Sequence, residues 1–167
     1  MMRKSRPSSP SSLRTRGVVV IELALVTVLL ATMMFGALDL GRAMYAYNEI
    51  AQSTRTAARY LATSPTVGAT EVSRARNLVI YGSFSNSGPA LTSELTASST
   101  AIQFCTPSYC DIPGASTASM TNQPVTGAGT VNLVQVQVSN LTLISYFPQT
   151  VADMLFKTIS VTLPRVG

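Results

Sequence analysis

The chain has 167 residues, with 12 basic and 7 acidic side chains, two Cys, no Trp and no His. Without His, the commonest general base and metal ligand is missing, and the length suits a single domain of ordinary size. A net charge of +5 would ordinarily indicate nucleic acid or an anionic membrane surface as the partner.

The first 16 residues supply the whole excess of positive charge. They contain five basic side chains and no acid, whereas residues 17–167 contain seven of each. Ser, Pro and Arg dominate this segment, so residues 1–16 are expected to be disordered. We interpret residues 1–17 as a basic leader peptide and expect no nucleic-acid partner.

An apolar run of 21 residues follows, from Val18 to Leu38, and its only charge is Glu22. A helix of this length covers the roughly 30 Å of a bilayer core. Basic residues precede the run and Asp39 follows it, so residues 18–38 are predicted to span a membrane with the N-terminus cytoplasmic. A buried core helix and a cleaved secretory signal are the alternatives, although signals normally have only about 7 to 15 apolar residues.

Residues 39–63 are predicted to continue the same helix, because no breaker occurs before Ser64-Pro65. One side of this segment is polar and the other is less polar, as in an amphipathic helix. The polar stripe consists of Asn48, Gln52, Arg55 and Arg59, and the less polar face of Met44, Tyr47, Ala51, Thr54, Ala58 and Leu61. The less polar face needs a cover, which the following chain can provide.

Residues 64–167 are expected to form an exported α+β domain. A second helix is predicted over residues 71–81, ended by Gly82, with turns at 83–89 and one or two helical turns within 149–156.

Strands are predicted over residues 100–105, 134–138 and 159–163. In the last two, apolar and polar residues alternate strictly, which is typical of half-buried strands. A small antiparallel sheet packed on the long N-terminal helix would bury both apolar faces, so the predicted fold class is α+β.

Cys105 and Cys110 are separated by four residues, a spacing that suits a small disulfide-closed loop in an exported domain. Two free thiols are the alternative. A zinc site would need more ligands than two Cys and no His provide.

The start of the apolar run combines Gly17, Val18 and Glu22. A carboxylate inside a membrane segment costs about 2.5–3.5 kcal/mol near the centre, so Glu22 is expected to have a partner or a function. A cut after Gly17 would give Val18 a free ammonium group one helical turn from Glu22, able to pair with that acid in the same chain or a neighbouring one. Alternatively, Glu22 lies solvated at the interface and Gly17 is incidental.

At these residues the sequence resembles a type IV pilin leader, and more closely the TadE-like family of minor pilins or pseudopilins of tight-adherence (Flp) pilus systems. The resemblance covers the leader and span, Gly41-Arg42 with Tyr45 and Tyr47, Gln52 to Tyr60 and, more weakly, residues 134–138, Tyr146-Phe147-Pro148 and the last strand. One departure is Leu23, since Flp pilins and many relatives place an aromatic residue after the glutamate.

The resemblance implies a pilin-like fold and insertion in the bacterial inner membrane with the C-terminal domain periplasmic. It also implies cleavage between Gly17 and Val18 by a prepilin peptidase, with Glu22 as the assembly carboxylate. The implied partners are other pilin or pseudopilin subunits and the pilus assembly machinery, and the implied role is assembly of a pilus used in surface adhesion and biofilm formation.

No catalytic motif is present in the sequence, and we expect no enzyme activity, cofactor, metal or small-molecule substrate. Residues 127–129 form only a fragment of a phosphate loop, and a Gly-x-Ser-x-Gly motif is absent. Charged side chains of the C-terminal part are expected to face solvent, namely Glu71, Arg74, Arg76, Glu94, Asp111 and Asp153.

Two further hypotheses compete with the pilin interpretation. One is an uncleaved single-pass binding module of the cell envelope, and the other is a secreted domain released by signal peptidase. The mature N-terminus distinguishes the three hypotheses. It is expected at Val18 for a pilin, at Met1 or Met2 for an uncleaved anchor, and beyond residue 38 for a released domain.

Overall fold

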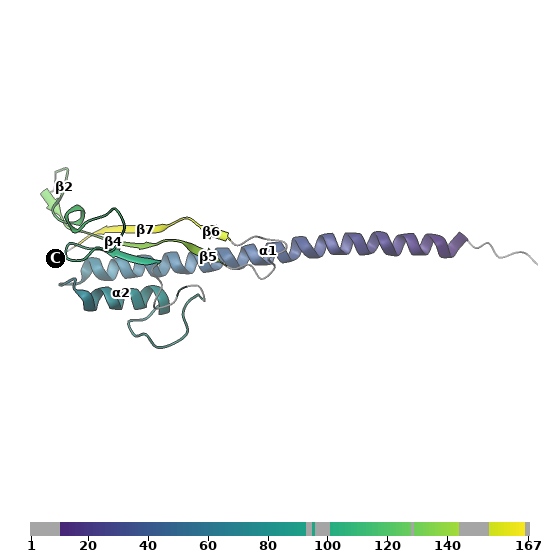
Figure 1. Cartoon of the computed structure of the whole chain (residues 1–167), viewed down its shortest axis with the longest axis horizontal. Helices are drawn as coiled ribbons and strands as arrows, with labels where there is room; N and C mark the ends of the chain where they lie inside the picture. The colour runs from purple at the N-terminus through teal and green to yellow at the C-terminus, as the bar shows by residue number, and fades with distance from the viewer. Residues whose placement is uncertain (1–10, 93–94, 96–100, 128, 144–153, 166–167) are drawn as a thin grey trace, which may run out of the picture.

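The protein is a long helix with a small domain wrapped around one of its ends (Figure 1). The computed structural model describes residues 11–92, 95, 101–127, 129–143 and 154–165. The expectations for Glu94, Asp153 and Tyr146-Phe147-Pro148 therefore lie outside the described residues, as does that for residues 1–10.

Helix α1 runs without interruption from Ser11 to Thr63, which confirms the predicted continuation of the helix beyond residue 38. The expectation of disorder is wrong for residues 11–16, which form the first turns of α1. Leu and Arg in this segment are good helix formers, and extending an existing helix costs far less than starting one. At the other end, the Ser64 N–H donates to the Tyr60 carbonyl (3.0 Å), and Pro65 stops the helix.

Helix α2, Ala69–Tyr81, runs back along α1 (Figure 1). It begins two residues before the predicted start, where the Gly68 N–H donates to the Glu71 carboxylate (3.0 Å). It ends as predicted at Gly82, whose φ of 67° is left-handed and whose N–H donates to the Leu78 carbonyl (3.0 Å).

Three antiparallel strands form the main sheet, in the order β1-β4-β7. Their bounds are Ile102–Cys105, Leu133–Val138 and Ile159–Pro164, so all three predicted strands are confirmed within the described residues. Val136 pairs with Phe104 on one side and Val161 on the other. Because side chains alternate across a strand, the Val residues of β4 all face the core.

Two smaller sheets and a 3-10 turn complete the domain. The turn η1 is Thr117–Met120; β2 (Gln123–Val125) pairs with β3 (Gly129–Val131), and β5 (Leu141–Leu143) pairs with β6 (Met154–Phe156). The predicted helical turns are wrong at Met154–Phe156, because an apolar triplet fits a short paired strand as well as a helix. Residues 149–153 of that prediction lie outside the described residues.

The core lies between α1, α2 and the main sheet. In Figure 1 α2 covers one side of α1 and β4 and β7 cover the other, so the C-terminal half of α1 is enclosed from two directions. Ile50, Ala57 and Leu61 of α1 are completely buried there together with Phe104. The architecture is α+β, with a long N-terminal helix packed on a small antiparallel sheet, as predicted.

The polar stripe of α1 is exposed along its whole length, as the amphipathic pattern predicts. The less polar face was only partly identified from the sequence. Thr54, Ala58 and Leu61 are buried, but Met44 is 48% exposed although the adjacent Ala43 is buried, so Met44 lies on the uncovered face of α1.

Candidate functional site

Gly17, Val18 and Glu22 all lie in the N-terminal half of α1 and are exposed. No heavy atom lies within 4 Å of the position that a Gly17 Cβ would occupy, apart from the local helix backbone. Val18 and Glu22 are four residues apart, so their side chains lie on the same helix face. Within the described part of the chain, the Glu22 carboxylate has no hydrogen bond or ion pair. It is therefore available to a group from outside this chain.

The segment around Glu22 is an uncovered apolar helix. None of residues 17–38 is buried, and the structure contains one candidate membrane span among the described residues, within the helical segment Gly17–Thr63. Its only hydroxyl groups donate to the helix backbone, Thr27 to the Leu23 carbonyl (2.7 Å) and Thr32 to the Leu29 carbonyl (2.8 Å). Polar side chains satisfied in this way are compatible with a lipid environment. Glu22 is the exception in this segment.

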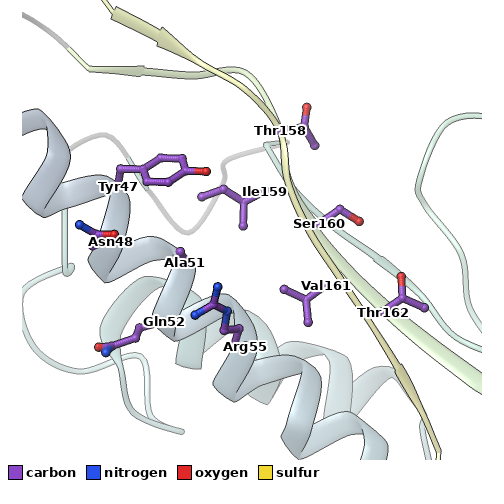
Figure 2. A pocket seen from close by; sticks show the side chains of 10 residues that line it. All are labelled: Tyr47, Asn48, Ala51, Gln52, Arg55, Thr158, Ile159, Ser160, Val161 and Thr162. Carbon is purple, nitrogen blue, oxygen red and sulfur yellow. The ribbon is translucent and has the colours of Figure 1, made fainter.

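A groove of about 660 Å³ lies between α1 and β7 (Figure 2). Ile159 and Val161 point from β7 toward the helix, and Tyr47 and Arg55 point from the helix toward β7. The lining contains one cation, Arg55, and no carboxylate. The sequence indicated the polar stripe on α1 but not the strand that faces it, because that pairing joins residues about 100 positions apart.

Cys105 and Cys110 form a disulfide that closes a short loop after β1. The Thr106 N–H donates to the Tyr109 carbonyl (2.7 Å) within the loop, and the Ser108 hydroxyl donates to the Val67 carbonyl. The loop therefore ties β1 to the chain between α1 and α2. This role is local packing.

Asp111 and Arg76 meet beside the disulfide loop. The Arg76 guanidinium lies 3.7 Å from the Asp111 carboxylate and 5.3 Å from the centre of the Phe104 ring, and the Phe104 N–H donates to the same carboxylate. Both side chains lie at the surface as expected, 27% and 28% exposed, but they pair with each other instead of facing solvent alone. A salt bridge between residues 35 positions apart leaves no local signal in the sequence. Arg74, in contrast, is exposed as expected.

Tyr109 adds a third group to this cluster. Its hydroxyl donates to the Asp111 carboxylate (3.2 Å). The negative charge of Asp111 raises the pKa of Tyr109, with smaller contributions from burial and from this hydrogen bond, while Arg76 acts in the opposite direction. The cluster orients surface groups but contains no nucleophile beside a base. Among the described residues, no three His, Cys, Asp or Glu side chains come together as a metal site.

The fold and these positions define a class: an α+β domain built on the second half of a helix whose first half is a candidate membrane span. Residues 17–59 match the family model of TadE-like proteins, which confirms the resemblance inferred from the sequence over this segment. The match covers 43 of the 167 residues and includes the apolar N-terminal part of α1. No curated protein and no solved structure matches the chain.

The matched segment begins at Gly17 and ends at Arg59. It therefore contains Glu22, the uncovered apolar helix and the polar stripe, and none of the sheet. The family match therefore lies entirely on α1. It includes residues 17–38, which the domain leaves uncovered, and residues 39–59, around which the domain packs.

Proposed function

We propose that the protein is a membrane-anchored minor pilin or pseudopilin that takes part in assembling a tight-adherence (Flp) pilus, used in surface adhesion and biofilm formation. The observation that carries this proposal is the position of Gly17 and Glu22. They stand four intervening residues apart at the start of an uncovered apolar helix, inside the segment with TadE-like sequence. The chain acts by assembly and performs no catalytic step itself.

In this proposal a prepilin peptidase hydrolyses the peptide bond between Gly17 and Val18. The leader leaves with the new Gly17 carboxylate, and Val18 keeps a free ammonium group. This group lies about 6 Å along the helix axis from Glu22. A neighbouring subunit's ammonium group could pair with the Glu22 carboxylate and offset the cost of holding that charge in a membrane or helix bundle.

The proposed location is the bacterial inner membrane, crossed once, with the N-terminus cytoplasmic and the domain in the periplasm. Basic leader residues before the span favour this orientation. The uncovered helices of several subunits would bundle through their apolar faces, while the domains make the outer contacts. A pseudopilin of this kind would prime or anchor the pilus, or enter it as a minor subunit.

N-terminal sequencing of the protein from the membrane fraction tests the proposed processing. A mature chain that starts at Val18 is expected. An intact Met1 or Met2 would favour an uncleaved envelope anchor that takes no part in a pilus. A start beyond residue 38 would indicate a released domain.

Replacement of Glu22 by Ala tests the assembly role separately. A charge-assisted hydrogen bond contributes about 1.5–3 kcal/mol, so incorporation into pili should fall by about tenfold or more while membrane insertion stays intact. Thr27→Ala is the matched control, because Thr27 is exposed on the same helix and bonds only its own backbone. Unchanged piliation in Glu22→Ala would remove the proposed role of this carboxylate.

A further inference from the structure

The exposed face of α1 changes character within one turn, between Tyr45 and Asn48. Met34, Leu38, Gly41 and Tyr45 follow each other at helical spacing, and all except Gly41 are large apolar or aromatic side chains that are exposed. The same line continues with Asn48 and Gln52, which are polar and exposed. Along this line, apolar side chains therefore continue seven residues beyond Leu38, with Arg42 exposed beside them.

Asp39 does not interrupt that surface. Its side chain points to the covered side of α1 and is 9% exposed, as is Ala43 at 8% one turn further on. The neighbouring Leu40 and Met44 are exposed instead. The charge that marks the end of the apolar run in the sequence is thus absent from the outer face of the folded protein.

Two exposed charges lie near the ends of the apolar run, Glu22 within its first turn and Arg42 one turn after Leu38. They lie 20 residues apart on one helix. At 1.5 Å per residue this separation is about 30 Å, the thickness of the hydrocarbon core of a bilayer. A bilayer placed between these two charges leaves Glu22 near one interface and Arg42 near the other.

We infer that Leu38, Leu40, Met44 and Tyr45, here called the α1 patch, bind the headgroup region of the lipid bilayer, so that the folded domain sits directly on the membrane surface. The inference rests on the membrane anchoring in the proposed function and goes beyond it. The patch is continuous with the candidate span, and its members are between 48% and 69% exposed. Tyr45 suits this depth because its ring is apolar and its hydroxyl is polar, a property typical of interfacial aromatic residues.

The domain also has aromatic and basic side chains close to the level of Tyr45 along the α1 axis. Tyr47, two residues after Tyr45, stacks on Phe156 of β6 with the ring centres 5.2 Å apart. Lys157 follows Phe156 directly and is exposed. Because Phe156 contacts Tyr47, Lys157 follows directly on a residue packed two positions from Tyr45, and its exposed ammonium group is offered as a ligand for lipid phosphate. In this inference Tyr45 contributes to the bilayer contact from the helix and Lys157 from the domain.

The absence of Trp from the chain permits a direct test, since a single introduced Trp reports its own depth. Three full-length variants are reconstituted into phosphatidylcholine–phosphatidylglycerol vesicles: Tyr45→Trp, Leu29→Trp within the span, and Gln52→Trp on the same face about 10.5 Å further along α1. Lipids brominated near the headgroup or near the chain ends quench Trp at the corresponding depth. Met44→Trp is a second reporter for the patch, and circular dichroism checks that each variant is folded.

The expected result is strong quenching of the Tyr45→Trp variant by the shallow bromines and weaker quenching by the deep ones. The Leu29→Trp variant should show the reverse order, and the Gln52→Trp variant should not be quenched. If Leu29→Trp is quenched while Tyr45→Trp and Met44→Trp are not, the domain stands clear of the membrane and this inference fails, although the membrane anchoring remains.

Two other outcomes also overturn the inference. Unquenched fluorescence of Leu29→Trp, in protein that does not float with vesicles, would refute membrane anchoring itself, and with it that part of the proposed function. A blue-shifted emission of Tyr45→Trp that responds to the protein-to-lipid ratio but not to bromine would assign the patch to contacts between subunits.

Discussion

The two halves of α1 share one continuous backbone but meet different surroundings, and their compositions differ accordingly. Residues 17–38 are the most apolar part of the chain, yet none of them is buried by the domain. Residues 39–63 are less apolar, yet they supply Ile50, Ala57, Ala58 and Leu61 to the core with no exposed area. In this helix, therefore, the most hydrophobic residues are not the ones that form the protein core.

Side-chain size explains the difference. The covered half is enclosed by α2 and by the sheet, so small residues such as Ala57 and Ala58 permit close approach on both sides. In the part of the chain that the structure describes, none of residues 17–38 is buried, so packing restricts the side-chain volume there less than in the covered half. Large aliphatic side chains there increase the apolar area that a bilayer can accept.

The largest expected difference between the halves is seen when the same substitution is made in each. Ile50→Ala should lower the free energy of unfolding by about 2–5 kcal/mol, because Ile50 is fully buried and its loss leaves a cavity. Ile21→Ala, at a position 63% exposed, should change it by almost nothing. Urea denaturation of both variants in detergent micelles measures this contrast. Similar losses of unfolding free energy in the two variants would contradict the division of α1 into a covered and an uncovered half.

A charge placed in each half should give the opposite pattern. Leu30→Arg should weaken membrane insertion by about 2.5–3.5 kcal/mol, because Leu30 lies in the uncovered half and faces lipid in the proposed arrangement. Gln52→Arg, exposed in the covered half, should leave insertion unchanged. The fraction that stays in membranes after an alkaline wash is the measurement. Equal retention of both variants would count against a membrane span.

Two glycines should respond with opposite signs. Gly82 ends α2 with a positive φ of 67°, so Gly82→Ala should cost about 1–2 kcal/mol. Gly41 is helical with open space around it, so Gly41→Ala should stabilise the protein by about 0.5–1 kcal/mol. Thermal unfolding followed by circular dichroism distinguishes the two. A loss of stability in Gly41→Ala would show that something packs against this glycine.

The smallest expected effect is a titration in the domain, at a site far along the sequence from the candidate span. The Asp111 carboxylate raises the pKa of Tyr109, so stability from the neutral Tyr109 is present below about pH 10 and is lost as the pH rises further. Asp111→Asn should bring the pKa of Tyr109 back toward its ordinary value. Ultraviolet difference titration against Tyr109→Phe isolates this tyrosine from the other five. An unchanged titration in Asp111→Asn would exclude the carboxylate as the cause.

Much of the secondary structure can be predicted from short sequence patterns. The alternation in residues 134–138 predicts β4, and Gly82 predicts the end of α2. The short strands were missed because three residues are too few to display a period: β2, β3, β5 and β6 are each of this length. Their pairing depends on chain segments that tertiary structure brings together.

The part of the candidate site that lies on one helix can be predicted from the sequence. Gly17, Val18 and Glu22 are identified by their spacing at the junction between the basic leader and the apolar run. The burial of Asp39 was not predictable, since a helical wheel does not reveal which faces the domain will cover. Ile50 was missed for the same reason, because α1 is enclosed on two sides and a search for one apolar stripe identifies only one of them.

Because α1 is one unbroken helix, it also fixes the angle about the helix axis at which the domain is oriented relative to the candidate span. Each residue of an α-helix turns the chain by about 100° and advances it by about 1.5 Å. Removing one residue between Leu38 and Gly41 would therefore rotate the whole domain by more than a quarter turn about the helix axis, with hardly any change in height. The direction in which the groove and the disulfide loop face is thus encoded in the number of residues along α1.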